Sequence, residues 1–286
     1  MTGLDDLVGE EYGPVPIEPT PDRVAEFVVA TGDDPDRWAS VVPPSFANAA
    51  LFAVAPRFLE DPRVVPFTRS LIHSEQRFEW ARPAAVGETI DVVGRVGAVR
   101  QRAGLNLVSF EVSASLDRGP WLSGSAQFLL STEPAAAAAE EKEPGASERP
   151  AHDLPGVPLP LPEMGEALEP MRVGASRLDL VRYAAASRDW NPIHWDHWSA
   201  VAIGLPGTIV HGLLMTAWMA QLAARYSTAD LPLESLAVRF RKPLRPAVPA
   251  SVSGAVAARA DTGTDLDLVL EADGERLITG TARVTP

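Results

Sequence analysis

The pattern of apolar and polar positions predicts the same series of elements twice along the chain. Apolar residues at helical spacing predict a short and a long helix in each half, at residues 22–30 and 45–58 and again at residues 178–186 and 212–226. Alternating or β-branched segments predict four strands after each long helix. These are residues 74–80, 89–99, 106–115 and 121–131 in the first half, and 236–242, 250–258, 265–271 and 277–284 in the second.

Local sequence supports this internal repeat. Arg77-Phe78 with Arg82-Pro83-Ala84 recurs as Arg239-Phe240 with Arg245-Pro246-Ala247, with 162 positions between Arg77 and Arg239. A long apolar helix followed by antiparallel strands predicts an α+β unit whose sheet wraps around the helix. We therefore expect two such units side by side. Two unrelated α+β domains are the alternative, and the matched order of elements disfavours them.

A linker is predicted between the two halves. Residues 132–156 are rich in Ala, Glu and Pro and lack apolar periodicity, as linkers do. The expected division is therefore residues 1–131, a linker at 132–156, and residues 157–286.

Composition and charge narrow the classes of function. The 286 residues carry a formal net charge of −13, which disfavours binding to nucleic acid or to an anionic membrane. There are no cysteines, which excludes disulfides, thiolate nucleophiles and cysteine-based zinc sites. No apolar run is long enough to span a bilayer, and the acidic N-terminus does not resemble a signal peptide. We therefore expect a cytoplasmic protein.

The segment from Asp189 to His194 carries the candidate chemistry. Pro192 disfavours helical geometry at Asn191, so we expect a turn at a helix end where the side chains of Asp189 and His194 point at one spot. A carboxylate and an imidazole that share one water molecule are suited to general acid–base catalysis near neutral pH. Burial of this turn by Trp190, Ile193 and Trp195 is expected to shift both pKa values.

His211-Gly212 begins the second long helix. The first amides of a helix have no partner within it and lie at its positive end, and a glycine allows close approach. The Gly212 amide is therefore a candidate donor to a developing oxyanion. An acid–base pair and an oxyanion donor are what reversible hydration of an α,β-unsaturated thioester requires.

Residues 186–214 resemble the MaoC-type, (R)-specific enoyl-CoA hydratases. That family has an Asp-x-Asn-Pro-x-His segment followed by His-Gly at a helix start. The residues that fit are Asp189, Asn191, Pro192, His194, Asp196, His211 and Gly212, with 23 positions between Asp189 and Gly212. The first half resembles the degenerate N-terminal hotdog that accompanies such domains, through residues 73–78, Arg82-Pro83 and Gly87. The resemblance implies a double hotdog.

The resemblance also implies roles for single residues. Asp189 and His194 would be the catalytic pair, and the Gly212 amide the oxyanion donor. By the same resemblance, Asn191 and Asp196 shape the loop and Ser187 positions the water or the loop. From the residues themselves, His211 is a helix-entry residue that contacts backbone or else a proton carrier, and Trp190, Trp195 and Trp198 either wall an acyl pocket or pack a helix end. The first half should be catalytically silent, because Asp33-Asp34-Pro35 is not followed by a histidine and Val42-Pro43-Pro44-Ser45 contains no His-Gly. We expect it to complete a tunnel for the acyl group.

On this resemblance the substrate is an acyl thioester of CoA or of an acyl-carrier protein, and neither a metal nor an organic cofactor is needed. The chain would be a monomeric pseudo-dimer or form a homodimer. Two rival functions stay open at this stage: a hotdog acyl-thioesterase, and a non-catalytic subunit that binds acyl thioesters.

Two further patterns have competing interpretations. Asp189, His194, Asp196, His197 and His211 could ligate a metal, but they lack the helical His pair of a zinc hydrolase, and His197 is expected at the surface. The second pattern is the densest basic cluster of the chain: Arg239, Arg241, Lys242 and Arg245. It is either an anchor for the phosphates of CoA or phosphopantetheine, with Arg239 and Arg241 on one face of a strand, or a charged edge strand.

Overall fold

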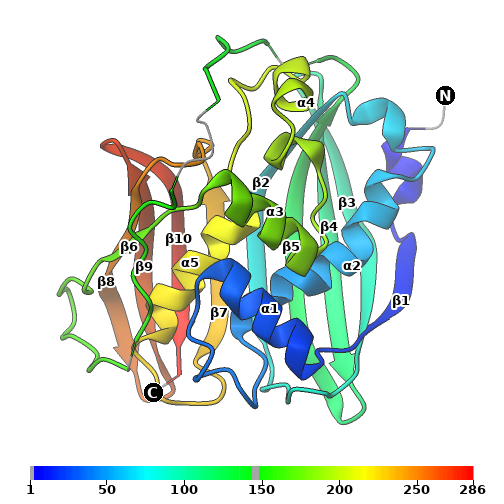
Figure 1. The fold of residues 1–286 in the computed structure, drawn as a ribbon. Helices are drawn as coiled ribbons and strands as arrows, with labels where there is room; N and C mark the ends of the chain where they lie inside the picture. The colour runs from blue at the N-terminus through cyan, green and yellow to red at the C-terminus, as the bar shows by residue number, and fades with distance from the viewer. Residues whose placement is uncertain (1–2, 135, 144–147, 157, 286) are drawn as a thin grey trace.

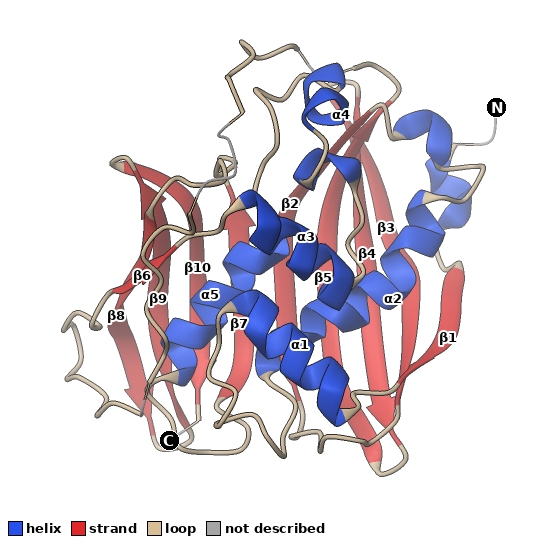
Figure 2. Cartoon of the chain, in the orientation of Figure 1, coloured by secondary structure: helices blue, strands red, loops and turns tan. Residues whose placement is uncertain are grey.

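A single ten-stranded antiparallel sheet runs through the whole protein and curves around the helices (Figures 1 and 2). The structure is a computed structural model and describes residues 3–134, 136–143, 148–156 and 158–285. Its helices are α1 (Pro21–Thr31), α2 (Ala47–Leu59), α3 (Arg177–Ser187), α4 (His197–Ala202) and α5 (Gly212–Ala224). None of the helices in these ranges has the length and apolar character needed to cross a bilayer.

The strands fall into two groups of five. In the first half they are β1 (Glu11–Ile17), β2 (Ser70–Trp80), β3 (Ile90–Arg102), β4 (Leu105–Leu116) and β5 (Gly119–Ser131). In the second half they are β6 (Met171–Val173), β7 (Leu233–Phe240), β8 (Ala250–Ala260), β9 (Gly263–Ala272) and β10 (Glu275–Val284). The order across the sheet is β1-β3-β4-β5-β2-β7-β10-β9-β8-β6.

The strand order confirms the predicted repeat. The first half reads 1-3-4-5-2, and the second half reads the equivalent strands in the reverse direction. The two halves meet where β2 pairs with β7, from Glu75 opposite Arg239 to Glu79 opposite Ser235. Backbone hydrogen bonds therefore join the halves into one sheet, which is a stronger connection than side-chain packing alone.

Three elements were missed by the sequence pattern, and several strand boundaries were misplaced. Strand β1 contains two prolines, and Ile17 alone of its residues is buried, so it shows no alternation. Strand β6 has only three residues, and α4 is a six-residue helix. Strand β7 ends at Phe240, so the predicted strand position of Arg241 is wrong. The interpretation as an edge strand is also wrong, because β7 lies in the middle of the sheet.

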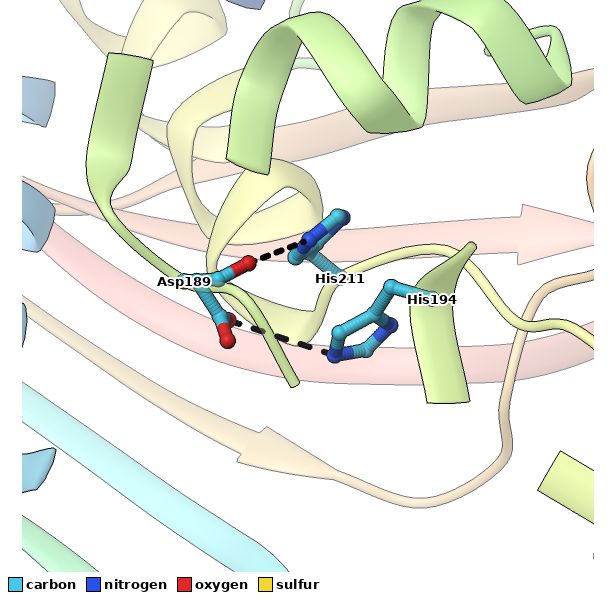
Figure 3. Close-up of side chains that lie close together, drawn as sticks. All are labelled: Asp189, His194 and His211. Carbon is cyan, nitrogen blue, oxygen red and sulfur yellow. Dashed lines mark hydrogen bonds and ion pairs between the residues drawn. The ribbon is translucent and has the colours of Figure 1, made fainter. Parts of the chain in front are cut away.

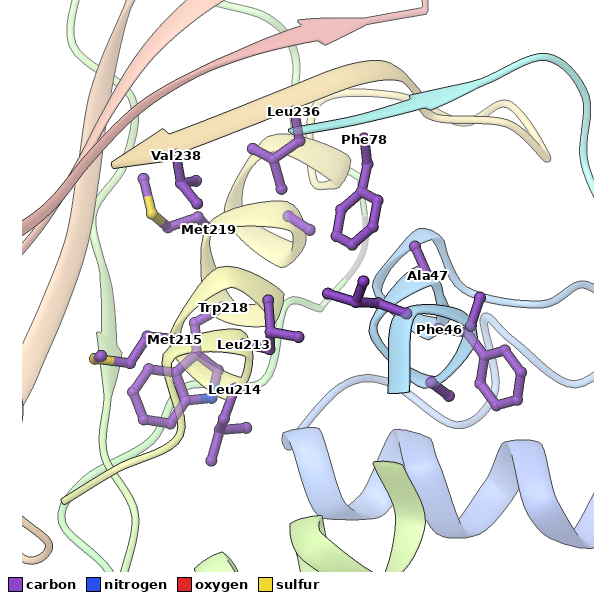
Figure 4. Packing of buried hydrophobic residues seen from close by; sticks show 14 of the residues in the cluster. Phe46, Ala47, Phe78, Leu213, Leu214, Met215, Trp218, Met219, Leu236 and Val238 are labelled. Atoms are coloured by element: carbon purple, nitrogen blue, oxygen red, sulfur yellow. The ribbon is translucent and has the colours of Figure 1, made fainter. Parts of the chain in front are cut away.

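The two long apolar helices form the centre of the core. Helices α2 and α5 lie side by side on the concave face of the sheet, and α1 and α3 lie over them (Figure 2). Residues Leu213 to Ala224 of α5 are all buried, and Figure 4 shows buried side chains of α5 together with Phe46, Ala47 and Phe78 of the first half. Trp218 is fully buried, and its indole N–H donates to the Thr31 carbonyl at 3.2 Å. Truncation of such a side chain costs about 3–5 kcal/mol, so this helix is held firmly.

The linker follows the second half of the protein closely. Its described residues form no helix or strand, but Arg149 donates to the Gly174 carbonyl at 3.3 Å and Asp153 forms an ion pair with Arg172 at 2.7 Å. The segment therefore packs against the domain that follows it.

Candidate active site

The position of Asp189 is set by the end of helix α3. The helix begins with a capping box of Ser176 and Asp179 and ends at Ser187, where Arg188 adopts a left-handed conformation with φ of 69°. This turn directs the chain back toward the helices. The Ser187 hydroxyl donates to the Tyr183 carbonyl at 2.7 Å and accepts from the Asp189 amide at 3.2 Å. Ser187 therefore supports the loop.

The turn after Asp189 carries His194 on a short 3-10 helix, Pro192–His194. Asn191 caps it, because its side chain accepts from the Ile193 amide, and Pro192 is tolerated at the first position of a helix. Asp196 caps α4 through the Ser199 amide at 2.9 Å. The loop-shaping contacts expected of Asn191 and Asp196 are therefore present.

Asp189 and His194 converge in a buried position (Figure 3). The exposed fractions of the two residues are 5% and 6%, and Asp189 Oδ2 lies 3.9 Å from His194 Nε2. That separation is too long for a direct hydrogen bond and leaves both atoms free to bind one oxygen between them. His194 Nδ1 lies 2.9 Å from the Ile209 carbonyl, which can only accept. Nδ1 therefore carries the proton, and the Nε2 lone pair faces Asp189.

Burial sets the protonation state of this pair. Loss of solvation raises the pKa of Asp189 to about 7, against the lowering effect of the Asn191 amide. Burial lowers the pKa of His194 to about 4, opposed by the bond to Ile209. Near neutral pH the imidazole is therefore neutral while the carboxyl group lies close to its midpoint. A pair in which one group is poised to exchange a proton is suited to acid–base work.

His211 is fully buried and lies face to face with His194, with ring centroids 3.8 Å apart and an interplanar angle of 23°. Its Nε2 donates to the Asp189 carbonyl at 3.2 Å, as Figure 3 shows. Burial, and secondarily the neighbouring His194, lower the pKa of His211 well below its usual value. His211 therefore contacts backbone at the helix entry and stays neutral.

Asp189, His194 and His211 lie close enough together to be considered as metal ligands. Donor atoms of Asp189, His194 and His211 lie within 4.8 Å of one another. A ring nitrogen binds a metal in the plane of its ring, and two nearly parallel stacked rings do not direct their lone pairs at one point. Both rings also use one nitrogen to donate to a carbonyl. The arrangement suits proton exchange better than metal ligation.

Gly212 is the first residue of α5, with His211 as its N-cap. Its amide hydrogen has no partner within the helix and lies at the positive end of the helix dipole. A side chain here would meet Phe240, because a Cβ atom built on Gly212 lies 3.1 Å from the ring. Glycine therefore leaves the helix start tightly packed against Phe240 without displacing its ring.

Three residues around the site were not anticipated. Tyr183 is fully buried, with its ring 4.8 Å from that of His211, and burial, together with the charge of Asp189, raises its pKa. Asn48 comes from the first half and donates to the Leu213 carbonyl at 2.8 Å and to Tyr183 Oη at 3.3 Å. Ile209 supplies the carbonyl that orients His194. Asn48 could have been found in the sequence as a lone polar residue in an apolar helix. Ile209 acts through its backbone carbonyl, so the sequence holds no signal for it.

Two expectations about nearby aromatic and histidine residues are wrong. Trp190 and Trp195 are 48% and 41% exposed, so they do not bury Asp189 and His194. The surrounding helices do so instead. The side chain of His197 is only 12% exposed and lies between Glu140 and Glu143 of the linker.

The basic cluster does not converge on one point. Arg239 pairs with Glu75, and Lys242 pairs with Glu275. Arg241 follows the end of β7 and its Nε lies 3.4 Å from the Thr279 hydroxyl. The side chain of Arg245 is only 13% exposed and donates to the Thr208 carbonyl at 2.8 Å. Arg239, Arg241 and Lys242 are therefore accessible, whereas Arg245 is engaged inside the protein.

The comparisons with known proteins agree with this description. Residues 162–263 match the MaoC like domain, and residues 6–115 match the FAS1-like dehydratase domain region. A 3-hydroxyacyl-thioester dehydratase of Mycobacterium tuberculosis is 28% identical over 275 residues, which cover 94% of this chain and 86% of the relative.

Solved structures give the fold. A MaoC-like dehydratase superimposes with a TM-score of 0.83 at 22% identity over 99% of both chains. A conserved hypothetical protein of Mycobacterium tuberculosis, described as a double hotdog, has a TM-score of 0.63 at 14% identity over 99% of this chain and 98% of the other. The fold is therefore a double hotdog, as expected. Each half of the chain is thus similar to a dehydratase model, the first half to the FAS1-like dehydratase region and the second to the MaoC like domain.

Proposed function

We propose that the protein is a hydro-lyase that reversibly hydrates 2-enoyl thioesters to 3-hydroxyacyl thioesters, with Asp189, His194 and the Gly212 amide as its catalytic groups. The observation that carries the proposal is the buried pair of Asp189 and His194, 3.9 Å apart, beside a helix that starts with glycine. The mycobacterial relative named a 3-hydroxyacyl-thioester dehydratase supports the substrate class.

The chemistry follows from the proton positions. Neutral His194 presents the Nε2 lone pair, and Asp189 is near its midpoint, so the two can hold one water molecule and accept a proton from it. The water oxygen bonds to the β-carbon, and the electrons of the double bond move toward the thioester oxygen. The Gly212 amide stabilises that enolate oxygen. The proton then returns from the pair to the α-carbon, which completes the addition of water, and dehydration is the reverse.

Several finer points belong to the proposal. We expect a CoA thioester, with a carrier-protein thioester as the alternative, and an (R)-3-hydroxy product by resemblance to the (R)-specific hydratases. The accessible side chains of Arg239, Arg241 and Lys242 are the candidate phosphate anchors. Residues 1–131 would form a silent hotdog that lines an acyl tunnel, and residues 157–286 the catalytic one.

Turnover of an enoyl-CoA tests the proposal. Crotonyl-CoA and a longer 2-enoyl-CoA are incubated with the protein, and we expect loss of the enoyl absorbance with CoA still esterified. Chiral analysis of the product tests the (R) assignment. Release of free thiol would instead favour a thioesterase, and binding without turnover a non-catalytic subunit.

A matched pair of variants links turnover to the site. His194→Gln should lower kcat by ~10²–10⁴-fold with the fold intact, because glutamine cannot take up a proton. His152→Gln changes a histidine of the linker that lies outside the site and should retain turnover. Unchanged kcat in His194→Gln would contradict the assignment.

A further inference from the structure

A carboxylate of the linker is held inside the catalytic half. The linker runs along the loop before α5, because Ala138 donates its amide to the Gly204 carbonyl at 2.8 Å and Glu141 donates to the Pro206 carbonyl at 2.7 Å. These contacts bring the next acidic side chain, Glu143, under the loop. Its side chain is only 15% exposed.

Two hydrogen-bond partners and two guanidinium groups surround the Glu143 carboxylate. Oε1 accepts from the Thr208 amide at 2.8 Å and lies 3.0 Å from His197 Nδ1. Arg177 Nε lies 3.1 Å from Oε2, and Arg245 Nη2 lies 3.6 Å from Oε1. We call this arrangement the Glu143 clamp, and it consists of Glu143 with Arg177, His197, Thr208 and Arg245. These partners of Glu143 come from the start of α3, the start of α4, the loop and the segment after β7.

The charges in the clamp reinforce one another. Burial by itself raises the pKa of Glu143, but the hydrogen bonds from Thr208 and His197 outweigh it and lower the pKa. The bonds to Glu143 and then Glu140 raise the pKa of His197, which favours its charged form. Hydrogen bonds between charged partners are stronger than neutral ones. Further carboxylates near these cations are more exposed: Glu141 is 63% exposed and 3.7 Å from Arg245, and Glu140 is 51% exposed and 3.1 Å from His197.

The loop backbone is shaped for these contacts. Gly207 adopts φ of 144°, a conformation that side chains rarely allow. A Cβ atom built there would also lie 2.8 Å from His197 Nδ1 and close to the Arg245 guanidinium. Only glycine therefore lets the His197 and Arg245 side chains approach Glu143 across this loop.

The clamp acts on the residue next to the one that orients the catalytic histidine. Thr208, whose amide binds Glu143, precedes Ile209. The Ile209 amide donates to the Ile193 carbonyl at 3.2 Å, and its own carbonyl accepts from His194 Nδ1 at 2.9 Å. Movement of Thr208 would therefore shift the acceptor that keeps the His194 Nε2 lone pair directed at Asp189.

We propose that Glu143 is a positioning residue for the hydration reaction: its carboxylate, supplied by the linker, fixes the Thr208–Ile209 backbone and thereby the tautomer and orientation of His194. This inference rests on the proposed function for its kinetic consequence. The effect of Glu143 on the tautomer and orientation of the His194 ring does not depend on that function.

The test compares Glu143→Gln with Glu140→Gln as a matched control. Glu140 contacts the same histidine through Nε2 but is 51% exposed and does not touch the loop backbone. We expect Glu143→Gln to lower kcat by ~10–10²-fold, with KM for crotonyl-CoA little changed, because small misplacements of catalytic groups cost about this much. Glu143→Asp keeps the charge and should recover part of the rate. Glu140→Gln should stay close to wild type.

A spectroscopic measurement makes the test independent of turnover. The chain has five histidines, so ¹⁵N-histidine NMR can resolve His194. We expect a fixed Nδ1–H tautomer in the wild type and a mixture of tautomers in Glu143→Gln. If Glu143→Gln does not fold, the same two readouts are taken on Glu143→Asp.

Two results would overturn the positioning role. One is an unchanged His194 spectrum with unchanged kcat. The other is a lower KM with unchanged kcat, which would mean that Glu143 merely occupies a site for a substrate phosphate. Failure of the wild type to hydrate any enoyl thioester would count against the proposed function. The NMR result would still show whether Glu143 fixes the tautomer of His194.

Discussion

Asp33 and Asp189 occupy equivalent places in the two halves, yet their surroundings differ. Each lies two residues after the end of a short helix, and each is 5% exposed. Burial raises the pKa of Asp33 to about 6 and that of Asp189 to about 7. A buried carboxyl group with a raised pKa is therefore common to both halves and does not by itself define a catalytic site.

The neighbours of the two carboxyl groups make the difference. Five positions after Asp33 the chain has Trp38, where the catalytic half has His194. The first long helix begins at Ala47 with Phe46 as its N-cap, where α5 has Gly212 and His211. An indole and a phenyl ring cannot exchange protons, so the first half lacks an acid–base partner.

The first half uses its equivalent loop to hold the catalytic helix. Arg37 donates to the carbonyls of Ala224 and Ser227, both at 2.8 Å, at the C-terminal end of α5. The Thr31 carbonyl accepts from Trp218 and from Gln221, both at 3.2 Å. The loop that carries the proposed catalytic pair in one half thus has a structural role in the other.

The largest expected effect separates the two carboxyl groups by function. Asp189→Asn should lower kcat for crotonyl-CoA by ~10²–10⁴-fold, since an amide cannot exchange the proton, whereas Asp33→Asn should stay close to wild type. Initial rates of hydration measure both. Equal losses would mean that the first half is not silent.

A second experiment compares the same two variants by stability. Because both folded-state pKa values are raised above 3.8, the protonated forms are favoured by folding, and that stabilisation is lost as pH rises toward about 6 for Asp33 and about 7 for Asp189. Asparagine does not ionise. At pH 8 each variant should therefore gain on the order of a few kcal/mol in free energy of unfolding over wild type, with the larger gain for Asp189→Asn.

Urea unfolding at pH 5 and pH 8 measures this gain. The advantage of the variants should shrink at pH 5, where the wild-type carboxyl groups are largely protonated in the folded state. A gain that is independent of pH would show that burial does not raise the pKa values of these carboxyl groups.

The helix starts offer a smaller contrast. Gly212→Ala should lower kcat by about tenfold, because the new methyl group meets Phe240 and displaces the amide from its position. Ala47→Gly should leave kcat unchanged and cost about 0.5–1 kcal/mol of stability through lost helix propensity. Kinetics and thermal unfolding on both variants test the pair. A kcat loss in Ala47→Gly would contradict the assignment of the oxyanion donor to α5 alone.

The smallest expected effect concerns Arg37. Arg37→Ala removes two hydrogen bonds to the end of α5 and should cost about 1–3 kcal/mol of stability, with kcat near that of the wild type. Ser227→Ala removes only a side chain and keeps both acceptor carbonyls, so it serves as the control. Stability equal to wild type in Arg37→Ala would remove the structural role inferred for the first half.

Sequence alone predicted the elements with strong periodicity and the contacts that depend on neighbours in the chain. The helices near residues 45–58 and 212–226 and their strands were found because burial of one face enforces a regular pattern. The turn from Asp189 to His194 was found because Asn191-Pro192 restricts the backbone locally.

The contacts that could not be predicted join distant parts of the chain. Asn48 reaches Leu213 from the other half, and Ile209 orients His194 through a carbonyl that any residue would provide. Trp190 and Trp195 were expected to bury the turn, but loop tryptophans next to a helix end can remain exposed, as these do.

The pairing of β2 with β7 has a consequence for how such a protein can change. In a symmetric homodimer every substitution occurs in both subunits, so a tryptophan in place of the histidine would remove both copies of the site at once. Here one continuous sheet joins two copies that are encoded separately. Trp38 and Phe46 therefore exist in one copy without any counterpart in the other. The first half of this chain can change its sequence while the site in the second half stays unchanged.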